Sequence, residues 1–397
     1  MACQERMIKL IKSTFYQEKL TKEKLCEFIL KSEQLSFGPE CKKFEQNFAK
    51  YQGRKYCVTF NSGSSANLAL IQALVNMNKV QKKDKAAFSA VTWSTNIMPL
   101  IQARLTPIPV DVELQTLNVS SRTLGETLKK FPDIKTLFLT NLLGFCDDID
   151  EIQKICNKKK ILLIEDNCDS MGTVYKGKKL GNFSFASTFS FYVGHNMSTI
   201  EGGAVCTDDE DLYVMLHIVR AHGWDRNLYP KYQKKLREEY KVGLFYGTFT
   251  FYDLGYNLRP TEITAFLGNF QLNFIDEIIN KRFENFRKIA IPLYLQTDKY
   301  FSLKYDHIEL LSNFAVPLIC KSKEIQDRLI KECRGKIEIR PILGGNILKQ
   351  PIASKYLKES QNILTPNADI IHDLGFYFGN NPDLTKEDII QIYSTFL

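Results

Sequence analysis

The chain has 397 residues, 44% of them hydrophobic and 12% aromatic, a globular composition large enough for two or three domains, which argues against extended disorder. Lysine and arginine outnumber aspartate and glutamate by 53 to 45, but this surplus lies in short scattered clusters, so it suits a small anionic substrate and favours no nucleic-acid partner. The ten cysteines form no C-x-x-C pair, no segment approaches the ~20 apolar residues of a membrane span, and the charged N-terminus does not resemble a signal peptide, so we expect a reduced cytoplasmic protein without a membrane segment.

The first half of the chain opens with a helical pattern and continues with a possible phosphate site. Residues 1–50 repeat apolar and charged residues at helical spacing, which predicts an N-terminal helical arm. Residues 55–60 are predicted to form a strand, 61–65 a turn and 66–74 a helix. The backbone N–H groups and hydroxyls of this turn are suited to bind a phosphate at the helix N-terminus; the residues are Gly63, Ser64 and Ser65. An ordinary helix cap is the alternative interpretation.

A series of apolar runs then predicts a sheet, with strands at residues 86–91, 105–110, 136–140 and 160–164 and helical spacing between several of them. This alternation is typical of a mainly parallel sheet covered by helices on both faces, which binds ligands at the carboxyl ends of its strands. Trp93 and Asp166 each follow such a run. An indole can stack on a planar ring and a carboxylate can keep a pyridine nitrogen protonated, whereas a core tryptophan and a helix-capping aspartate are the alternatives.

His195 lies between an apolar run that begins at Phe189 and the turn Glu201-Gly-Gly203. Its imidazole can take up and return a proton near neutral pH, but it lacks the primary amine that would hold an aldehyde cofactor as a Schiff base. A hydrogen-bonded structural histidine is the alternative.

The last part of the chain starts with a long helical pattern from Arg259, with Pro260 expected in the first helical turn. We expect this helix to lead into a smaller domain in which short strands and helices alternate. The predicted divisions are residues 1–50 for the arm, 51–280 for a large domain and 281–397 for a small C-terminal domain.

Together these residues resemble the sugar-nucleotide aminotransferase family of fold type I pyridoxal-phosphate enzymes over about residues 35–395. The ordered matches are Phe37-Gly-Pro39 with Phe44-Glu45, Ser62-Gly-Ser-Ser-Ala66, Val110-Asp111 with Thr116-Leu-Asn118, Glu165-Asp166 with Gly172, Ser190-Phe191, Glu201-Gly-Gly-Ala-Val205, His222-Gly223 and Gly255-Tyr-Asn-Leu-Arg259. The resemblance implies an α/β fold like that of aspartate aminotransferase, with a large domain on a mainly parallel sheet and a smaller C-terminal α+β domain.

The chain departs from the family at His195, which stands where those aminotransferases carry the Schiff-base lysine. This replacement resembles the 3-dehydratase branch, whose members remove the C3 hydroxyl of a nucleotide-linked 4-keto-6-deoxyhexose. One type in that branch also holds an iron-sulfur cluster. Here only Cys168 matches a ligand position, and the other three positions fall at Arg226, Leu228 and Leu236. Since four thiolates are usual, we expect the type without a cluster or other metal, in which L-glutamate converts pyridoxal phosphate to pyridoxamine phosphate.

The resemblance also implies roles for the candidate residues. Those expected to bind the cofactor are Gly63, Ser64, Ser65, Trp93, Asp166, Asp169, Ser190 and Asn257. His195 is the expected proton-transfer group, and His222 is either a second one or structural. Arg259 and Arg340 are candidates for a carboxylate or a pyrophosphate of the substrate, which a guanidinium fork suits. Asn257 is expected to reach the cofactor of a neighbouring subunit, which makes the protein a homodimer with shared active sites.

Two other functions compete with dehydration. One is a sugar aminotransferase in which His195 replaces the lysine, and the other is an inactive member of the fold that only binds a sugar nucleotide. The presence of Trp93, Asp166 and the phosphate turn argues against the inactive protein. The sugar aminotransferase can be distinguished from the dehydratase only by analysis of the reaction product.

Overall fold

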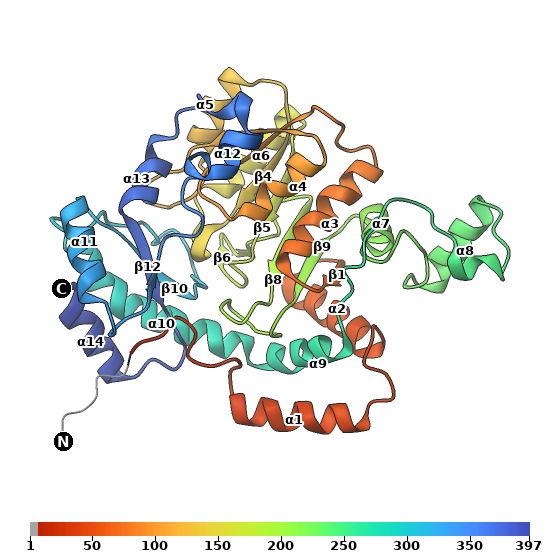
Figure 1. Cartoon of the computed structure of the whole chain (residues 1–397), viewed down its shortest axis with the longest axis horizontal. Coiled ribbons are helices and arrows are strands. Elements are labelled where there is room, and N and C mark those ends of the chain that lie inside the picture. The colour runs from red at the N-terminus through yellow and green to blue at the C-terminus, as the bar shows by residue number, and fades with distance from the viewer. Residues whose placement is uncertain (1–6) are drawn as a thin grey trace.

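A seven-stranded sheet forms the centre of the structure, a computed structural model that describes residues 7–397 (Figure 1). Its strands, in spatial order, are β1 (Tyr56–Phe60), β9 (Gly203–Thr207), β8 (Ala186–Ser190), β5 (Leu162–Asp166), β4 (Ile134–Thr140), β2 (Lys85–Ser89) and β3 (Thr106–Val110). The strands from β8 to β3 are parallel, and β9 runs antiparallel to both of its neighbours. The prediction of an α/β fold with a mainly parallel sheet is therefore confirmed.

Both faces of this sheet are covered by helices, because successive side chains of a strand point to opposite faces. In β4, Leu137 and Leu139 join one hydrophobic cluster while Phe138 joins another. The cluster of Phe138 contains side chains of α3 (Gly63–Asn76), α4 (Met98–Gln102) and α7 (Glu210–Arg220). The other contains side chains of α5 (Ser121–Lys130), α6 (Ile149–Lys159) and the later helix α10 (Ile275–Tyr294).

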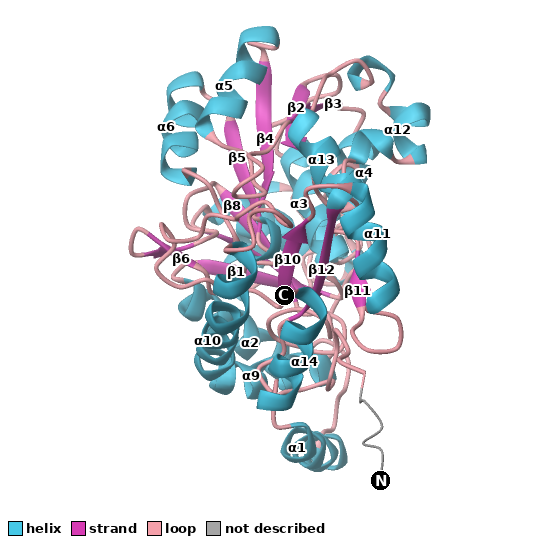
Figure 2. Cartoon of the chain, turned by 90° about the vertical axis from the view of Figure 1, so that its left-hand side faces the viewer, coloured by secondary structure: helices cyan, strands magenta, loops and turns pink. Residues whose placement is uncertain are grey.

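A second, antiparallel sheet lies beside the first and is built from the C-terminal part of the chain (Figure 2). Its strands are β10 (Ala315–Ile319), β12 (Gly375–Gly379) and β11 (Ile339–Arg340), in that order. The helices of this region are α11 (Lys323–Glu332), α12 (Pro351–Tyr356), α13 (Pro366–Leu374) and α14 (Lys386–Phe396). A short hairpin of β6 (Val174–Tyr175) and β7 (Lys178–Lys179) stands apart from both sheets.

The predicted arm contains α1 (Glu18–Lys31) and α2 (Pro39–Gln52), while residues 7–16 are not helical, and residues 1–6 lie outside the described part. The long helical pattern is α9 (Glu262–Gln271) followed by α10, which crosses residue 280. Pro260 is not in the first turn as predicted, because the side chain of Thr261 caps α9 and the helix begins one residue later. The division of the chain at residues 50 and 280 stays a proposal.

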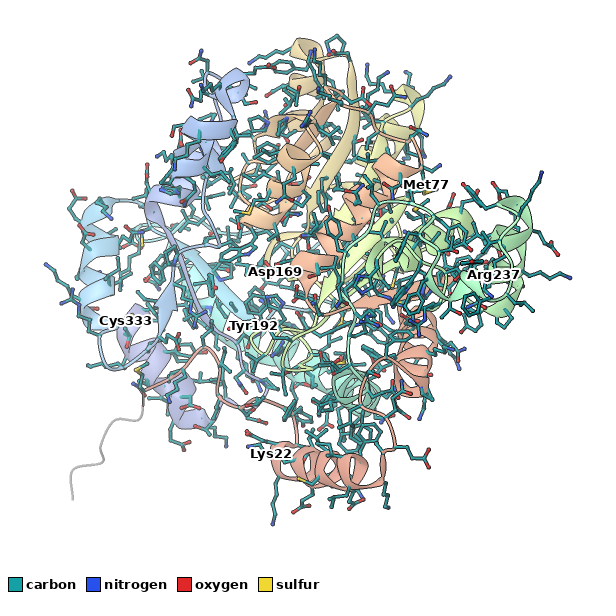
Figure 3. The ribbon with its side chains drawn as sticks, turned by 45° about the vertical axis from the view of Figure 1, so that its right-hand side comes forward. Lys22, Met77, Asp169, Tyr192, Arg237 and Cys333 are labelled. Atoms are coloured by element: carbon teal, nitrogen blue, oxygen red, sulfur yellow. The ribbon has the colours of Figure 1, made fainter. Side chains whose placement is uncertain are left out.

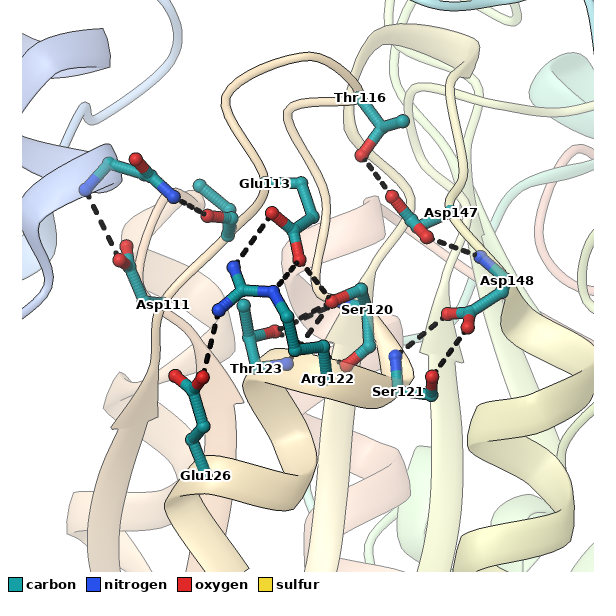
Figure 4. A network of polar contacts seen from close by, with 12 residues as sticks. Asp111, Glu113, Thr116, Ser120, Ser121, Arg122, Thr123, Glu126, Asp147 and Asp148 are labelled. Carbon is teal, nitrogen blue, oxygen red and sulfur yellow. Dashed lines mark hydrogen bonds and ion pairs between the residues drawn. The ribbon is translucent and has the colours of Figure 1, made fainter.

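The motif Val110-Asp111 with Thr116-Leu-Asn118 joins the two parts of the chain (Figure 4). The carboxylate of Asp111 accepts the backbone N–H groups of Asn367 and Ala368 at 3.2 and 2.9 Å, at the N-terminus of α13. Thr116 donates to Asp147 at 2.6 Å. Asp111 and Thr116 thus hold α13 and the loop after β3 in place.

A lobe around α8 (Pro230–Glu239) projects from the side of the molecule, and Figure 3 shows Arg237 in it. Arg237 pairs with the buried Asp225 at 2.7 Å, which ties the helix to the body. After α8 the chain exposes large apolar side chains, of which the exposed fraction of Phe245 is 83%. Within residues 7–397 no helix combines the length and the apolar character that crossing a membrane requires.

Candidate active site

A cavity of about 280 Å³ lies where β5 and β8 end and α3 begins, and residues of the second sheet close its other side. Figure 3 shows two of its lining residues, Asp169 and Tyr192, near the middle of the molecule. The predicted site residues that line it are Gly63, Ser64, Trp93, Asp166, Asp169, Ser190, His195 and Arg340. The cavity therefore occupies the carboxyl edge of the sheet, where the sequence predicts a ligand.

The N-terminus of α3 has the free donors that an anion site requires, from two of the three predicted residues. The helix begins at Gly63 instead of residue 66, since the hydroxyl of Ser62 caps it by accepting the N–H of Ser65 at 3.0 Å. The backbone N–H of Ser65 is therefore used in the helix cap, and Ser65 does not line the cavity. The backbone N–H groups of Gly63 and Ser64 have no acceptor within residues 7–397 and lie at the positive end of the helix dipole.

Glycine is required at position 63 by close packing. A Cβ atom there would lie 2.7 Å from the Cβ atom of Ser190 and 3.1 Å from the sulfur of Cys168. The missing side chain thus lets the hydroxyl of Ser190 approach the N-terminus of α3, where it adds a donor to the two backbone groups.

Asp166 is the buried carboxylate at the end of β5. Its Oδ2 atom accepts the side-chain amides of Asn67 and Asn96 at 3.0 and 2.7 Å, and its Oδ1 atom accepts the backbone N–H of Cys168 at 2.9 Å. A carboxylate has about four acceptor positions, so one is left for a donor in the cavity. Asn67 and Asn96 were not predicted, although an asparagine in the apolar start of a helix was a usable signal for the first of them.

His195 lies in the loop after β8, with its backbone N–H bonded to the carbonyl of Tyr192 at 2.9 Å and its ring packed on Phe314 at 5.2 Å between centroids. Its Nε2 atom is 3.7 Å from Oδ1 of Asp169, which is longer than a hydrogen bond. In the described part of the chain, the buried Nδ1 atom of His195 and Oδ2 of Asp169 have no hydrogen-bond partner. Each group thus keeps hydrogen-bonding capacity that the described chain does not use.

Burial shifts the pKa values of His195 and Asp169 in opposite directions. Loss of water, helped by the charge of Arg282, lowers the pKa of His195 to about 4, while loss of water and the charge of Asp166 raise the pKa of Asp169 to about 7. An ion pair would produce the reverse shifts, but at 3.7 Å without a hydrogen bond the attraction does not offset the cost of burial. At neutral pH the imidazole is therefore an uncharged base.

The opposite wall of the cavity comes from the N-terminus and the second sheet. Arg340 donates to one oxygen of Glu338 at 3.2 and 2.7 Å, and the other oxygen of Glu338 accepts the N–H of Leu10 at 2.9 Å. Leu10 itself lines the cavity, and nearby Ile8 pairs with Ile337 as in a parallel sheet. Glu338 thus fixes both Arg340, the predicted substrate-binding residue, and the N-terminal segment at Leu10.

Two aromatic residues line the cavity and differ in how far they are exposed to a planar ligand. The exposed fraction of Trp93 is 52%, so its ring is open to the cavity instead of packed in the core. Tyr377 of β12 is buried beside Asp169 and Arg340, and burial together with the charge of Asp169 raises its pKa to about 12. Tyr377 was not predicted, because nothing in its apolar strand distinguishes a cavity-facing tyrosine from a core residue.

Besides Ser65, three predicted residues lie outside this cavity. His222 has a left-handed backbone, donates its N–H to the carbonyl of Tyr256 and packs its ring on Trp224 at 4.7 Å. Asn257 is exposed, and its side-chain oxygen accepts Nε of Arg259 at 3.0 Å. A single chain therefore does not bring His222, Asn257 or Arg259 to His195.

The donor set fits pyridoxal phosphate. Free N–H groups and hydroxyls meet at a helix N-terminus, an open indole stands above the cavity floor, and a fixed carboxylate retains one acceptor position. Among the described lining residues there is no lysine. Within residues 7–397 no group of three or more histidine, cysteine, aspartate or glutamate side chains is placed to hold a metal, and the absence of an iron-sulfur cluster stays a prediction.

Comparison with known proteins agrees with this geometry. A family model described as the DegT/DnrJ/EryC1/StrS aminotransferase family matches residues 17–397. A GDP-4-keto-6-deoxy-D-mannose 3-dehydratase of Escherichia coli O55:H7 is 35% identical over 367 residues, which are 90% of this chain and 92% of that protein. A solved structure of the E. coli GDP-4-keto-6-deoxy-D-mannose-3-dehydratase with bound hydrated PLP matches with a TM-score of 0.88 at 31% identity, covering 99% of this chain and 100% of the other. A GDP-4-keto-6-deoxymannose-3-dehydratase with a trapped PLP-glutamate geminal diamine matches with a TM-score of 0.87 at 31% identity, covering 98% and 100%.

Proposed function

We infer that this chain, which belongs to the DegT/DnrJ/EryC1/StrS aminotransferase family, is a glutamate-dependent 3-dehydratase that uses pyridoxal phosphate to remove the C3 hydroxyl of a nucleotide-linked 4-keto-6-deoxyhexose. The observation that carries this inference is His195, an uncharged base beside Asp169 in a cavity whose described lining contains no lysine. A GDP-linked sugar is the first candidate substrate, because the relatives compared above act on one.

The phosphate end of the site is formed by four groups. The N–H groups of Gly63 and Ser64 and the hydroxyls of Ser64 and Ser190 would hold the phosphate, while the indole of Trp93 would cover one face of the ring. Asp166 would bond the ring nitrogen through its remaining acceptor position. When bound, pyridoxal phosphate supplies an aldehyde that takes up the amino group of glutamate and a ring that accepts electrons.

His195 moves the proton. Because burial keeps its imidazole uncharged at neutral pH, Nε2 can take a proton from the cavity side and deliver it to the departing C3 hydroxyl of the sugar. Asp169 lies 3.7 Å from Nε2 and stabilises the imidazolium that exists between these two events. With an imidazole here and no lysine amine, nothing in the site holds the aldehyde covalently between turnovers.

Arg340 is the proposed anchor for a carboxylate or pyrophosphate, since Glu338 fixes its guanidinium at the cavity wall. Arg259 and Asn257 would act across a dimer interface, where Asn257 reaches the phosphate of the partner's cofactor, and His222 stays an alternative proton carrier. We propose a homodimer for this reason. The nine described cysteines are free thiols, which supports the cytoplasm as the compartment.

Product mass is the decisive measurement for the reaction. The purified chain is incubated with pyridoxal phosphate, glutamate and a panel of nucleotide-linked 4-keto-6-deoxy sugars, without a reductase. A product that has lost one oxygen, formed together with 2-oxoglutarate and ammonia, is expected. A product that gains an amine instead identifies an aminotransferase, and no conversion of any sugar supports an inactive homologue.

The first variant to test is His195→Asn. Asparagine retains a polar side chain of smaller size but cannot relay the proton, so dehydration should fall by the ~10²–10⁴-fold that a general acid-base group contributes. The amount of bound pyridoxal phosphate should stay near that of the unchanged chain. Dehydration at the unchanged rate would transfer the role to another group, and His222→Asn is the variant that would then identify it.

A further inference from the structure

We propose that Arg282 is a positioning residue that holds the backbone of His195 and thereby presents the imidazole to the cavity. This inference rests on the proposed role of His195 and deepens it. Arg282 is not one of the predicted site residues, and it does not line the cavity in which the ligand is proposed to bind.

The contact is a fork on a single carbonyl. Both terminal nitrogens of the Arg282 guanidinium donate to the backbone oxygen of His195, each at 3.2 Å. Arg282 belongs to the 20-residue helix α10, so the donors are carried by a rigid element instead of a loop. Two donors from one planar group fix the direction of the carbonyl, and with it the peptide that follows His195.

The guanidinium is buried without a carboxylate partner. Its residue is 8% exposed, its Nε atom has no acceptor, and within residues 7–397 it forms no ion pair, although the charge of Asp383 acts on it from a longer distance. The fully buried Arg220 shows the usual solution, since it pairs with the buried Glu45 at 2.5 Å. Burying a charge without an ion pair costs free energy of folding. We therefore attribute the position of this guanidinium, in contact with the His195 backbone, to its effect on His195.

The same helix position also determines what lies against the ring. The carbonyl of Arg282 accepts the side-chain amide of Asn380 at 2.8 Å, and the backbone N–H of Asn380 donates to the carbonyl of Phe314 at 2.7 Å. The ring of Phe314 packs on the imidazole of His195. Arg282 thus connects the backbone and one ring face of His195 to α10.

His195 forms the wall between the active-site cavity and a small polar cavity of about 40 Å³ that Arg282 lines. The charge of Arg282 and the burial of the ring both lower the pKa of His195. The other ionisable side chains that line these two cavities are Tyr16, Asp166, Cys168, Asp169, Tyr192, Glu201, Arg340 and Tyr377. The charge of Asp383 acts on Arg282.

The experiment compares Arg282→Met and Arg282→Lys with Arg287→Met, a control for an exposed arginine on the same helix. The full chain carries bound pyridoxal phosphate and ¹³C-labelled histidine; it has five histidines, and the signal of His195 is the one absent from His195→Asn. Two quantities are measured: the pH midpoint of His195 by NMR, and the kcat and KM for conversion of the bound cofactor by glutamate.

Arg282→Met should move the midpoint of His195 upward by about one pH unit, since a positive neighbour is lost. Arg282→Lys keeps the charge and should leave the midpoint unchanged. Both variants should lower kcat by roughly 10–100-fold with little change in KM, because a lysine offers a point donor in place of the fork. Arg287→Met should resemble the unchanged chain in every respect.

The proposal fails if Arg282→Met has the same His195 midpoint and the same kcat as Arg287→Met. It also fails if both Arg282 variants lose cofactor binding as strongly as they lose kcat, because Arg282 would then be a purely structural residue. If Arg282→Met does not fold, Arg282→Lys still decides, since a normal kcat in it excludes the fork. The midpoint of His195 is read without any sugar, so failure of the dehydratase function would be seen separately in the product assay.

Discussion

His195 and Asp169 show that the proposed chemistry is unfavourable for the folded chain. Loss of water makes both groups harder to ionise, with a pKa of about 4 for the imidazole and about 7 for the carboxyl. A base that is uncharged and a carboxylate that is ready to stabilise its cation are useful only when a substrate proton is to be moved. The fold therefore gives up stability at Asp169 near neutral pH and at His195 in acid.

Asp169→Asn is expected to stabilise the cofactor-free chain. The folded pKa of Asp169 is raised to about 7 from 3.8, so the folded state binds the proton more tightly and its stability falls as the pH rises from 3.8 to 7. Asparagine removes this loss, by roughly 1–4 kcal/mol at pH 8. Urea unfolding at pH 5 and pH 8 measures it, and the gain should be larger at pH 8.

His195 has the opposite dependence, since its folded pKa is lowered from 6.5 to about 4 and stability rises with pH across that range. His195→Asn is therefore the matched control for Asp169→Asn. An equal gain for Asp169→Asn at both pH values would show that the carboxyl of Asp169 does not titrate in this window.

His195→Lys tests the missing amine directly. A primary amine at this place can capture the aldehyde of pyridoxal phosphate, so borohydride treatment and peptide mass mapping should find the cofactor attached to residue 195. The unchanged chain should give no modified lysine. Dehydration should be lost in the variant, and a cofactor-modified lysine in the unchanged chain would contradict the interpretation of His195 as the replacement for the lysine.

Among the elements, α2 depends on a carboxylate from another helix. Its N-cap residue is Gly38, which has no side chain to cap it, and the buried Glu262 of α9 accepts the N–H groups of Gly38, Glu40 and Cys41, each at 2.9 Å. A negative charge at a helix N-terminus with three N–H donors is a strong arrangement. Glu262 thus fastens the N-terminal arm to the rest of the chain.

Glu262→Gln should lower the free energy of unfolding by ~1–3 kcal/mol, because the amide presents N–H groups to donors and leaves at least one of them unsatisfied. Urea unfolding of the full chain measures the change, with Glu284→Gln, an exposed glutamate of α10, as the control. Equal stability of the two variants would mean that water replaces the Glu262 carboxylate at the end of α2.

The order of elements was readable from the sequence wherever burial was complete. The runs at residues 55–60 and 105–110 became β1 and β3 within one residue, since a strand buried on both faces is a continuous apolar run. The start of α3 was missed by three residues, because the cap at Ser62 is made by a hydroxyl that also fits a turn. A single capping hydrogen bond can determine where a helix begins, and amino-acid composition does not predict such a contact.

The site was predicted through residues whose chemistry is visible in the sequence, such as Trp93, Asp166 and His195. Asn96, Tyr377 and Arg282 escaped, because their roles depend on which distant segment they meet in the fold. A strand tyrosine or a helix arginine has the same local pattern whether it lies at a cavity, in the core or at the surface.

The whole molecule presents features of one half of a larger assembly. His222, Asn257 and Arg259 match the family pattern but lie away from the cavity. The neighbouring lobe exposes large apolar side chains, which in soluble proteins commonly mark an interaction surface. The exposed side chains are Tyr240, Leu244, Phe245, Tyr246, Phe249, Phe251 and Leu254. We propose that a second copy covers this surface and receives Asn257 in its own site.

Mixing two inactive variants tests the shared site. His195→Asn and Asn257→Ala should each be inactive, and after joint unfolding and refolding the mixed dimers contain one site with both residues intact. Random pairing should restore about a quarter of the activity of the unchanged chain. Sedimentation should give the mass of a dimer. No recovery from a mixture shown to contain mixed dimers would place Asn257 in the site of its own chain, and normal activity of Asn257→Ala alone would place it outside the chemistry.

Glu338 connects the beginning of the chain to the substrate wall, through the N–H of Leu10 on one oxygen and Arg340 on the other. This sharing constrains any redesign of substrate preference. Exchanging Arg340 for a residue that recognises a different sugar or nucleotide leaves one oxygen of Glu338 without its partner, and exchanging Glu338 to correct this releases Leu10. New specificity at this wall therefore has to be selected together with the segment around Leu10, so a library for directed evolution should vary Leu10, Glu338 and Arg340 as one unit.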